Sequence, residues 1–175
     1  MCMYLISVYF DEKTNATLCR QIQMIAKQTG NTFMVDRNVP PHLTILQIEA
    51  RDESVLLPYM ESLRGMIGRG EIRIVAAGML LPYVLCAMPV LNGYLQEVSE
   101  TVYRNFSEIP ETTIFKYYKP MSWMPHITLG KTLNKEQMQQ AVMVMQEQFV
   151  PLHATVTEIG LAKVNPHEDL LRFAL

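Results

Sequence analysis

Two short segments of the sequence share one pattern: proline, histidine, an aliphatic residue, threonine and a second aliphatic residue. They are Pro41-His42-Leu43-Thr44-Ile45 and Pro125-His126-Ile127-Thr128-Leu129. In a strand, residues i and i+2 point to the same face, so each histidine stands beside its threonine while the aliphatic residues face a core. Two histidines can serve as general base and general acid, and threonine hydroxyls can hold phosphate oxygens. The pattern therefore indicates acid–base chemistry on a phosphate ester.

In-line displacement at phosphorus needs the acid and the base on opposite sides of the reacting atom. If the two segments pack about a twofold axis, His42 and His126 face each other across a cleft. Thr44 and Thr128 would then stabilise the charge on the non-bridging oxygens in the transition state. Because the motifs are nearly symmetrical, the sequence does not say which histidine is the acid and which is the base.

The chain has two further histidines, which lack this context. His153 begins a third His-x-Thr match, but no proline precedes it and an alanine follows it, so we expect an ordinary strand residue. His167 follows Asn165 and Pro166 in a segment with the composition of a turn, which predicts a solvated turn residue.

The segment before the second motif is rich in aromatic and basic residues. Tyr118 and Trp123 could offer an aromatic face to a nucleobase, and Lys116 and Lys119 could offer positive charge to phosphates. Tyr117 could contribute in the same way. The alternative is that the rings of Tyr117, Tyr118 and Trp123 pack as ordinary apolar side chains.

Other catalytic chemistries gain little support from the sequence. Two histidines without a carboxylate at coordinating spacing make a poor zinc site, so we expect no metal. The chain also lacks a glycine-rich phosphate loop that ends in Lys-Ser or Lys-Thr, so a nucleoside triphosphatase or an ATP-dependent ligase gains no support, and we expect no cofactor.

Hydrophobic periodicity predicts alternating strands and helices. The expected strands cover residues 4–10, 42–48, 72–80, 84–88, 126–129, 155–164 and 170–175. The expected helices surround residues 18–26, 58–66, 91–106 and 136–149, with Gly30 ending the first and Asn134 as the N-cap of the last. Residues 105–122 read as a loop or a short extra strand. The order predicts a twofold β-α-β-α-β plan in one domain, 1–175, with repeat lobes of about 1–80 and 81–175.

Composition limits the partners and the compartment. With 175 residues, 49% of them hydrophobic, the chain can bury one sizeable core, and its net charge of −2 favours a small or terminal phosphate over long nucleic acid. The uncharged run 74–91 contains Gly78, Pro82 and Pro89, which favour two strands over a membrane helix. Three cysteines without a Cys-x-x-Cys spacing, and a first segment without a basic signal region, predict a cytoplasmic protein.

The paired Pro-His-Leu/Ile-Thr-Ile/Leu motifs resemble those of the two-histidine (2H) phosphoesterase superfamily, which includes bacterial 2′-5′ RNA ligase-like proteins and cyclic phosphodiesterases. The resemblance spans nearly the whole chain. It implies a bilobal α+β fold with two antiparallel sheets flanking a central cleft, with His42, Thr44, His126 and Thr128 as site residues. Many relatives have an arginine where this chain has Lys131, a change that keeps the charge but loses the two-pronged hydrogen bonding of a guanidinium.

The expected function is metal-independent hydrolysis of 2′,3′-cyclic or 2′,5′-linked phosphodiesters in nucleotides or at RNA termini. The substrate-binding candidates are Thr44, Thr128, Lys131, Trp123 and Tyr118, around the catalytic pair. The alternative is a protein that holds a nucleotide or RNA-terminal phosphate in the same cleft without turnover. A purely structural protein is the third reading. The intact histidine pair favours the enzyme, and none of these readings involves a membrane.

Overall fold

The computed structural model describes residues 1–175 and contains one eight-stranded antiparallel sheet. The strands are β1 (Cys2–Phe10), β2 (Leu43–Ala50), β3 (Gly70–Leu80), β4 (Val84–Pro89), β5 (Thr113–Ile114), β6 (Ile127–Gly130), β7 (Leu152–Lys163) and β8 (Glu168–Ala174). The helices are α1 (Glu12–Thr29), α2 (Phe33–Asp36), α3 (Leu57–Ser62), α4 (Gly93–Phe106) and α5 (Lys135–Gln148), and η1 (Glu53–Val55) and η2 (Lys116–Tyr118) are short 3-10 turns.

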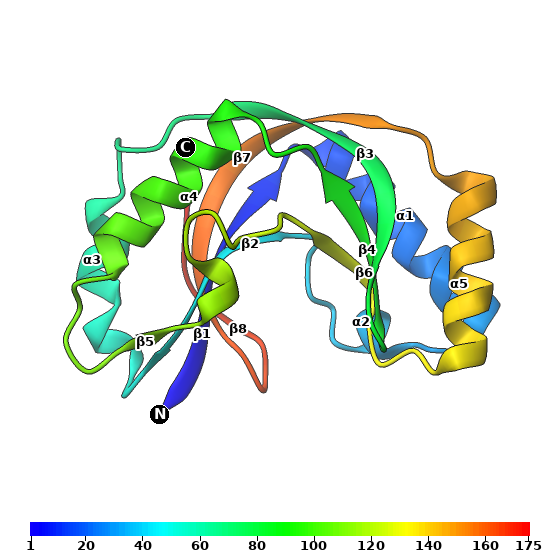
Figure 1. Cartoon of the computed structure of the whole chain (residues 1–175), viewed down its shortest axis with the longest axis horizontal. Coiled ribbons are helices and arrows are strands. Elements are labelled where there is room, and N and C mark those ends of the chain that lie inside the picture. The colour runs from blue at the N-terminus through cyan, green and yellow to red at the C-terminus, as the bar shows by residue number, and fades with distance from the viewer.

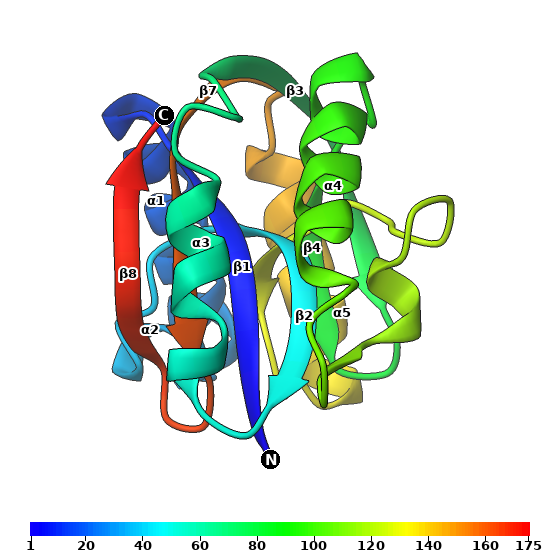
Figure 2. The ribbon, with the colours of Figure 1, turned by 90° about the vertical axis from the view of Figure 1, so that its left-hand side faces the viewer.

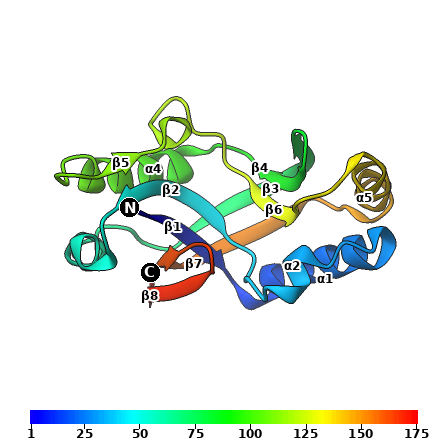
Figure 3. The ribbon, with the colours of Figure 1, turned by 90° about the horizontal axis from the view of Figure 1, so that it is seen from below.

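The sheet is bent into an arch (Figure 1). Its strand order is β5-β2-β1-β7-β3-β4-β6, and β8 pairs with β7 beside this path. Helices α3 and α4 lie at one end of the arch, as Figure 2 shows from that side, and α1, α2 and α5 lie at the other (Figure 3). The arrangement leaves the inner side of the arch free of long helices.

The predicted α+β class and antiparallel pairing are confirmed. The two expected sheets are joined into one, because β7 pairs with β1 along one part of its length and with β3 along another. Strand β7 is long enough to do this because it begins at Leu152, three residues before the predicted start, where Leu152 pairs with Ile74.

Both predicted signals for helix ends are confirmed. Gly30 ends α1 with a left-handed φ of 68°, a conformation that costs glycine little. Asn134 caps α5 by accepting the Gln137 amide N–H, while the Gln137 side chain accepts the Asn134 amide N–H. This reciprocal pair is a capping box, in which two of the unpaired amides at a helix start are satisfied. The helix expected at 58–66 is shorter, since α3 ends at Ser62 and Gly65 turns with a φ of 77°. The helix expected at 91–106 begins two residues later, at Gly93.

Helices from each half of the chain cover strands from the other half. Helix α1, which follows β1, packs against α5 and β6, and α4, which follows β4, packs against β2. Side chains such as Leu18 and Ile25 on α1, and Val102 and Phe106 on α4, are buried in one core of 37 residues. The two motif strands, β2 and β6, are thus each backed by a helix from a distant part of the chain.

The uncharged run 74–91 forms most of β3 and all of β4, joined by a turn at Leu81–Tyr83. None of the helices is both long enough and apolar enough to cross a bilayer.

Candidate active site

Both motif histidines line a single cleft of about 520 Å³. His42 stands immediately before β2 and His126 immediately before β6. The cleft walls come from β1, β2, β3, β4, β6, α2, η2 and the turn between β7 and β8. Although the two histidines are far apart in sequence, the curvature of the sheet brings them into one site, as the repeat predicted.

The two imidazoles are held in the same way. Nδ1 of His42 lies 2.8 Å from the carbonyl oxygen of Pro40, and Nδ1 of His126 lies 2.9 Å from that of Met124. A carbonyl oxygen can only accept, so each Nδ1 carries a proton and donates it. Nε2 of each ring has no hydrogen-bond partner in the protein and is left to exchange a proton with a ligand.

The motif proline explains this orientation. In both motifs the accepting carbonyl belongs to the peptide bond that enters the proline, at Pro41 and at Pro125. A residue before proline is restricted to extended backbone, which limits the directions its carbonyl can take. The x-Pro-His sequence therefore fixes the tautomer as well as the position of each histidine.

The aliphatic and threonine residues of the motifs alternate as predicted. Leu43, Ile45, Ile127 and Leu129 are completely buried in the core. Thr44 and Thr128 line the cleft beside the histidines.

Thr44 is buried and is held by a neighbouring strand. The Ser7 hydroxyl on β1 donates to Thr44 Oγ1 at 3.4 Å. Since the Thr44 oxygen accepts this bond, its own proton is free to be donated to a ligand.

Trp123 does not line the cleft, so the expectation that it offers a face to a base is wrong. Its side chain is buried, and its Nε1–H donates to the backbone carbonyl of Thr44 at 3.1 Å. The indole fills the core and ties the segment before one motif to the strand of the other. A tryptophan beside a motif can therefore be present for a hydrogen bond of its buried indole N–H as readily as for stacking on a base.

Two other predicted binding residues, Tyr118 and Lys131, do line the cleft. Burial raises the pKa of the Tyr118 hydroxyl above its ordinary value, so this residue is a neutral hydrogen-bonding group at physiological pH. Lys116, Tyr117 and Lys119 are exposed and are not part of the cleft wall.

The cleft has a positive side, of which the sequence indicated Lys131 but not Arg37. The Arg37 guanidinium lies 3.5 Å from the centre of the Phe33 ring, and Lys131 Nζ lies 6.0 Å from the same centre. Neither cation is in an ion pair. No aspartate or glutamate lines the cleft, although the whole chain is slightly acidic. These charges favour an anionic ligand.

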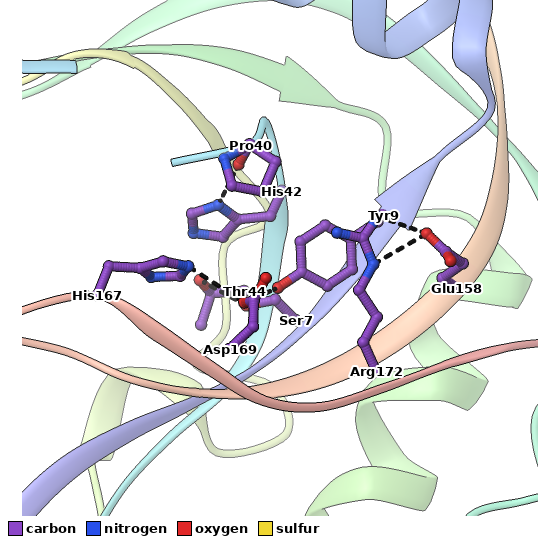
Figure 4. Close-up of polar contacts among 9 residues, drawn as sticks. All are labelled: Ser7, Tyr9, Pro40, His42, Thr44, Glu158, His167, Asp169 and Arg172. Atoms are coloured by element: carbon purple, nitrogen blue, oxygen red, sulfur yellow. Dashed lines mark hydrogen bonds and ion pairs between the residues drawn. The ribbon is translucent and has the colours of Figure 1, made fainter. Parts of the chain in front are cut away.

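His167 lies in a turn, as predicted, but it lines the cleft, so the prediction that it is solvated is wrong. The turn between β7 and β8 carries its imidazole to a position where the ring centre is 6.4 Å from that of His42 (Figure 4). Its Nε2 lies 3.2 Å from Asp169 Oδ1. Turn composition alone could not show where this hairpin points. By contrast, His153 is an exposed strand residue on β7, opposite Arg73.

The surroundings of His42 favour its neutral form. Burial lowers the pKa of His42, because a charged imidazolium loses its hydration. The hydrogen bond to the Pro40 carbonyl opposes this, and among the nearby charges His167 and His126 lower the pKa while Asp169 raises it. With Nδ1 protonated, the neutral ring offers an unprotonated Nε2.

Comparison with known families identifies the fold. The sequence pattern of the 2′-5′ RNA ligase superfamily matches residues 14–168. The chain belongs to this superfamily. The resemblance to two-histidine phosphoesterases that the motifs predicted is thereby confirmed. No curated protein sequence matches the chain.

Several solved structures share the whole architecture of this chain at low sequence identity. E. coli LigT, complexed with 3′-AMP, has a TM-score of 0.67 and 16% identity, covering 99% of this chain and 98% of LigT. TT0787 of Thermus thermophilus has a TM-score of 0.65 and 20% identity, covering 99% and 97%. A structure described as a phosphoesterase has a TM-score of 0.66 and 17% identity, covering 100% and 99%. These likenesses establish the fold.

Proposed function

We propose that the chain is a phosphodiesterase that hydrolyses 2′,3′-cyclic or 2′,5′-linked phosphodiesters of nucleotides or RNA termini by two-histidine acid–base catalysis. The observation that carries this proposal is the matched pair His42 and His126, each with Nδ1 on a backbone carbonyl and Nε2 unpaired in one cleft. Membership of the superfamily and the binding of 3′-AMP by E. coli LigT support a nucleotide ligand.

The reaction follows from the protonation states. Nε2 of neutral His42 takes a proton from water as the water oxygen attacks phosphorus. The bond from phosphorus to the 2′ or 3′ oxygen breaks, and that oxygen receives a proton from Nε2 of protonated His126. Thr44 and Thr128 donate to the non-bridging oxygens. Each turnover leaves His42 protonated and His126 neutral, and exchange with solvent restores both.

The assay uses purified protein with EDTA, a set of 2′,3′-cyclic nucleotides, and oligonucleotides that end in a cyclic phosphate. Phosphorus NMR follows the conversion of the cyclic phosphate and identifies the product as a 2′ or a 3′ monoester. We expect turnover that EDTA does not abolish. Measurable nucleotide binding without turnover would instead support the phosphate-binding alternative.

The pH dependence tests the role of His42. A base with a lowered pKa takes up its proton only at lower pH, so kcat/KM should persist as pH falls through the ordinary histidine value of about 6.5. It should decline only below the lowered pKa, where His42 takes up its proton. Steady-state rates from about pH 4.5 to pH 9 measure this profile. An acidic limb centred above about pH 6.5 would contradict the assignment of His42 as the base.

The positive side of the cleft gives a prediction on affinity. In the double variant Arg37→Gln/Lys131→Gln, KM for a cyclic nucleotide should rise about tenfold with a smaller change in kcat, since exposed charges each contribute modestly. The effect should shrink at high salt, which screens exposed charges. Lys119→Gln is the matched control, because Lys119 is exposed but does not line the cleft. An unchanged KM in the double variant would remove these cations from substrate binding.

A further inference from the structure

The turn between β7 and β8 brings a third histidine, His167, into the cleft. The turn between β7 and β8 contains Asn165 with a left-handed φ of 66°, a conformation that asparagine tolerates better than most residues. Asn165, Pro166 and His167 all form part of the cleft wall. The His167 side chain is 18% exposed, so it is largely enclosed yet open to a ligand.

Asp169 fixes which nitrogen of His167 is available. The Asp169 carboxylate lies on the Nε2 side at 3.2 Å and can only accept, so Nε2 carries a proton. Nδ1 has no hydrogen-bond partner in the protein. When the imidazole is protonated, Nδ1 also becomes a donor, and the ring can keep its bond to Asp169 while it binds a second acceptor.

Tyr9, Arg172 and Glu158 flank this pair. On β1, the Tyr9 hydroxyl donates to the same Asp169 oxygen at 3.5 Å. On β8, the Arg172 guanidinium lies 3.7 Å from the centre of the Tyr9 ring and is paired with Glu158 on β7. The Asp169 carboxylate is therefore free of any arginine partner, and its only ion-pairing partner is His167.

On the open side, His167 meets only neutral or basic groups. His42 is its stacked neighbour, and the other ionisable residues of the cleft are His126, Arg37, Lys131 and Tyr118. With no carboxylate lining the cleft, an acceptor for a protonated His167 has to come from the ligand.

We propose that the His167–Asp169 pair is an anion-binding element of the cleft, in which protonated His167 donates Nδ1–H to a terminal phosphate oxygen of the ligand. It rests on the proposed function in that the phosphate ligand is the product of the proposed reaction. The ligand class is the phosphomonoester product, which carries more negative charge than a cyclic diester. Because only a protonated imidazole has this second donor, an anion of constant charge should bind more tightly at lower pH.

The variant His167→Gln tests the proposal, because it removes the His167 imidazole and leaves the other ionisable groups of the cleft unchanged. The Gln amide nitrogen reaches the position of Nε2 and keeps the donor to Asp169, but it supplies nothing at Nδ1 and never becomes charged. The probes are 2′-AMP, 3′-AMP and inorganic sulfate. The charge of sulfate is constant over the pH range used, whereas that of the nucleotides is not. Binding is measured by NMR titration near pH 6 and near pH 8, with thermal unfolding as the check on stability.

Losing one charge-assisted hydrogen bond should lower the affinity of the variant about tenfold near pH 6. Near pH 8 the loss should be less than about twofold, because a neutral imidazole has no second N–H to lose. Asp169→Asn should give a smaller loss with the same pH dependence. His153→Ala, at an exposed histidine outside the cleft, should bind all three probes as the wild type does.

Two results would overturn the proposal. One is an unchanged affinity of His167→Gln near pH 6, and the other is an equal loss at both pH values, which a merely structural role would produce. The readout is binding and not turnover. If the protein hydrolyses no cyclic nucleotide but His167→Gln shows the acid-dependent loss of affinity, the proposed function is refuted and this inference stands. If the protein turns over cyclic nucleotides but His167→Gln shows no such loss, the proposed function stands and this inference is refuted.

Discussion

Replacing either His42 or His126 with alanine is expected to lower kcat for a 2′,3′-cyclic nucleotide by about 10²- to 10⁴-fold, the usual contribution of a positioned general acid or base. Each ring has an Nε2 without a protein partner in the cleft. The measurement is the rate of cyclic-phosphate opening at saturating substrate. KM should change far less than kcat, because the proton transfers occur in the transition state.

The double variant sharpens this prediction. Acid and base act on one transition state, so His42→Ala/His126→Ala should be little slower than the worse of the two single variants. Fully additive losses would mean that the histidines act independently and would contradict the shared mechanism. His153→Ala is the matched control, and its rate should equal that of the wild type because His153 is exposed and lies outside the cleft.

The second large effect is expected at the motif threonines. Thr128→Val keeps the shape of the side chain and removes its hydroxyl, and we expect kcat to fall about 10²-fold, as for loss of one donor to a developing oxyanion. Thr128 is half-buried, so its hydroxyl can be removed with little effect on folding. The rate at saturating substrate and the melting temperature, taken together, distinguish chemistry from stability.

Thr44→Val should lower kcat similarly but should also destabilise the fold. Thr44 is buried, and the change leaves the Ser7 hydroxyl without its partner, at a cost of about 1 to 3 kcal/mol. Ser7→Ala isolates that second effect, because it removes the bond but keeps the Thr44 hydroxyl. If Ser7→Ala and Thr44→Val reduced kcat equally, the Thr44 hydroxyl would have no direct role on phosphate.

The sequence predicted those parts of the molecule that local rules determine. Strand alternation placed Leu43 and Ile127 in the core and Thr44 and Thr128 on the face of the histidines, and the structure has this arrangement. Asn134 was predictable as a cap because a short polar side chain at that position satisfies the free amides of a helix start. The repeat of the motif predicted that both histidines share one cleft.

Other parts of the site depend on how distant segments meet. His167 looked like a solvated residue because its turn composition says nothing about the direction in which the β7–β8 hairpin folds. Trp123 looked like a stacking platform, yet the core around Thr44 encloses it. Arg37 stands in no recognisable motif, and it reaches the cleft through α2. The joining of two sheets through β7 depends on its length, which periodicity underestimated.

The most direct test of two-histidine catalysis is the hydrolysis of a 2′,3′-cyclic nucleotide in EDTA, followed by phosphorus NMR for the wild type, His42→Ala, His126→Ala and His153→Ala in parallel. We expect opening of the cyclic phosphate by the wild type and by His153→Ala, and loss of that activity in both cleft variants while each remains folded. Undiminished hydrolysis in either His42→Ala or His126→Ala would contradict catalysis by the histidine pair.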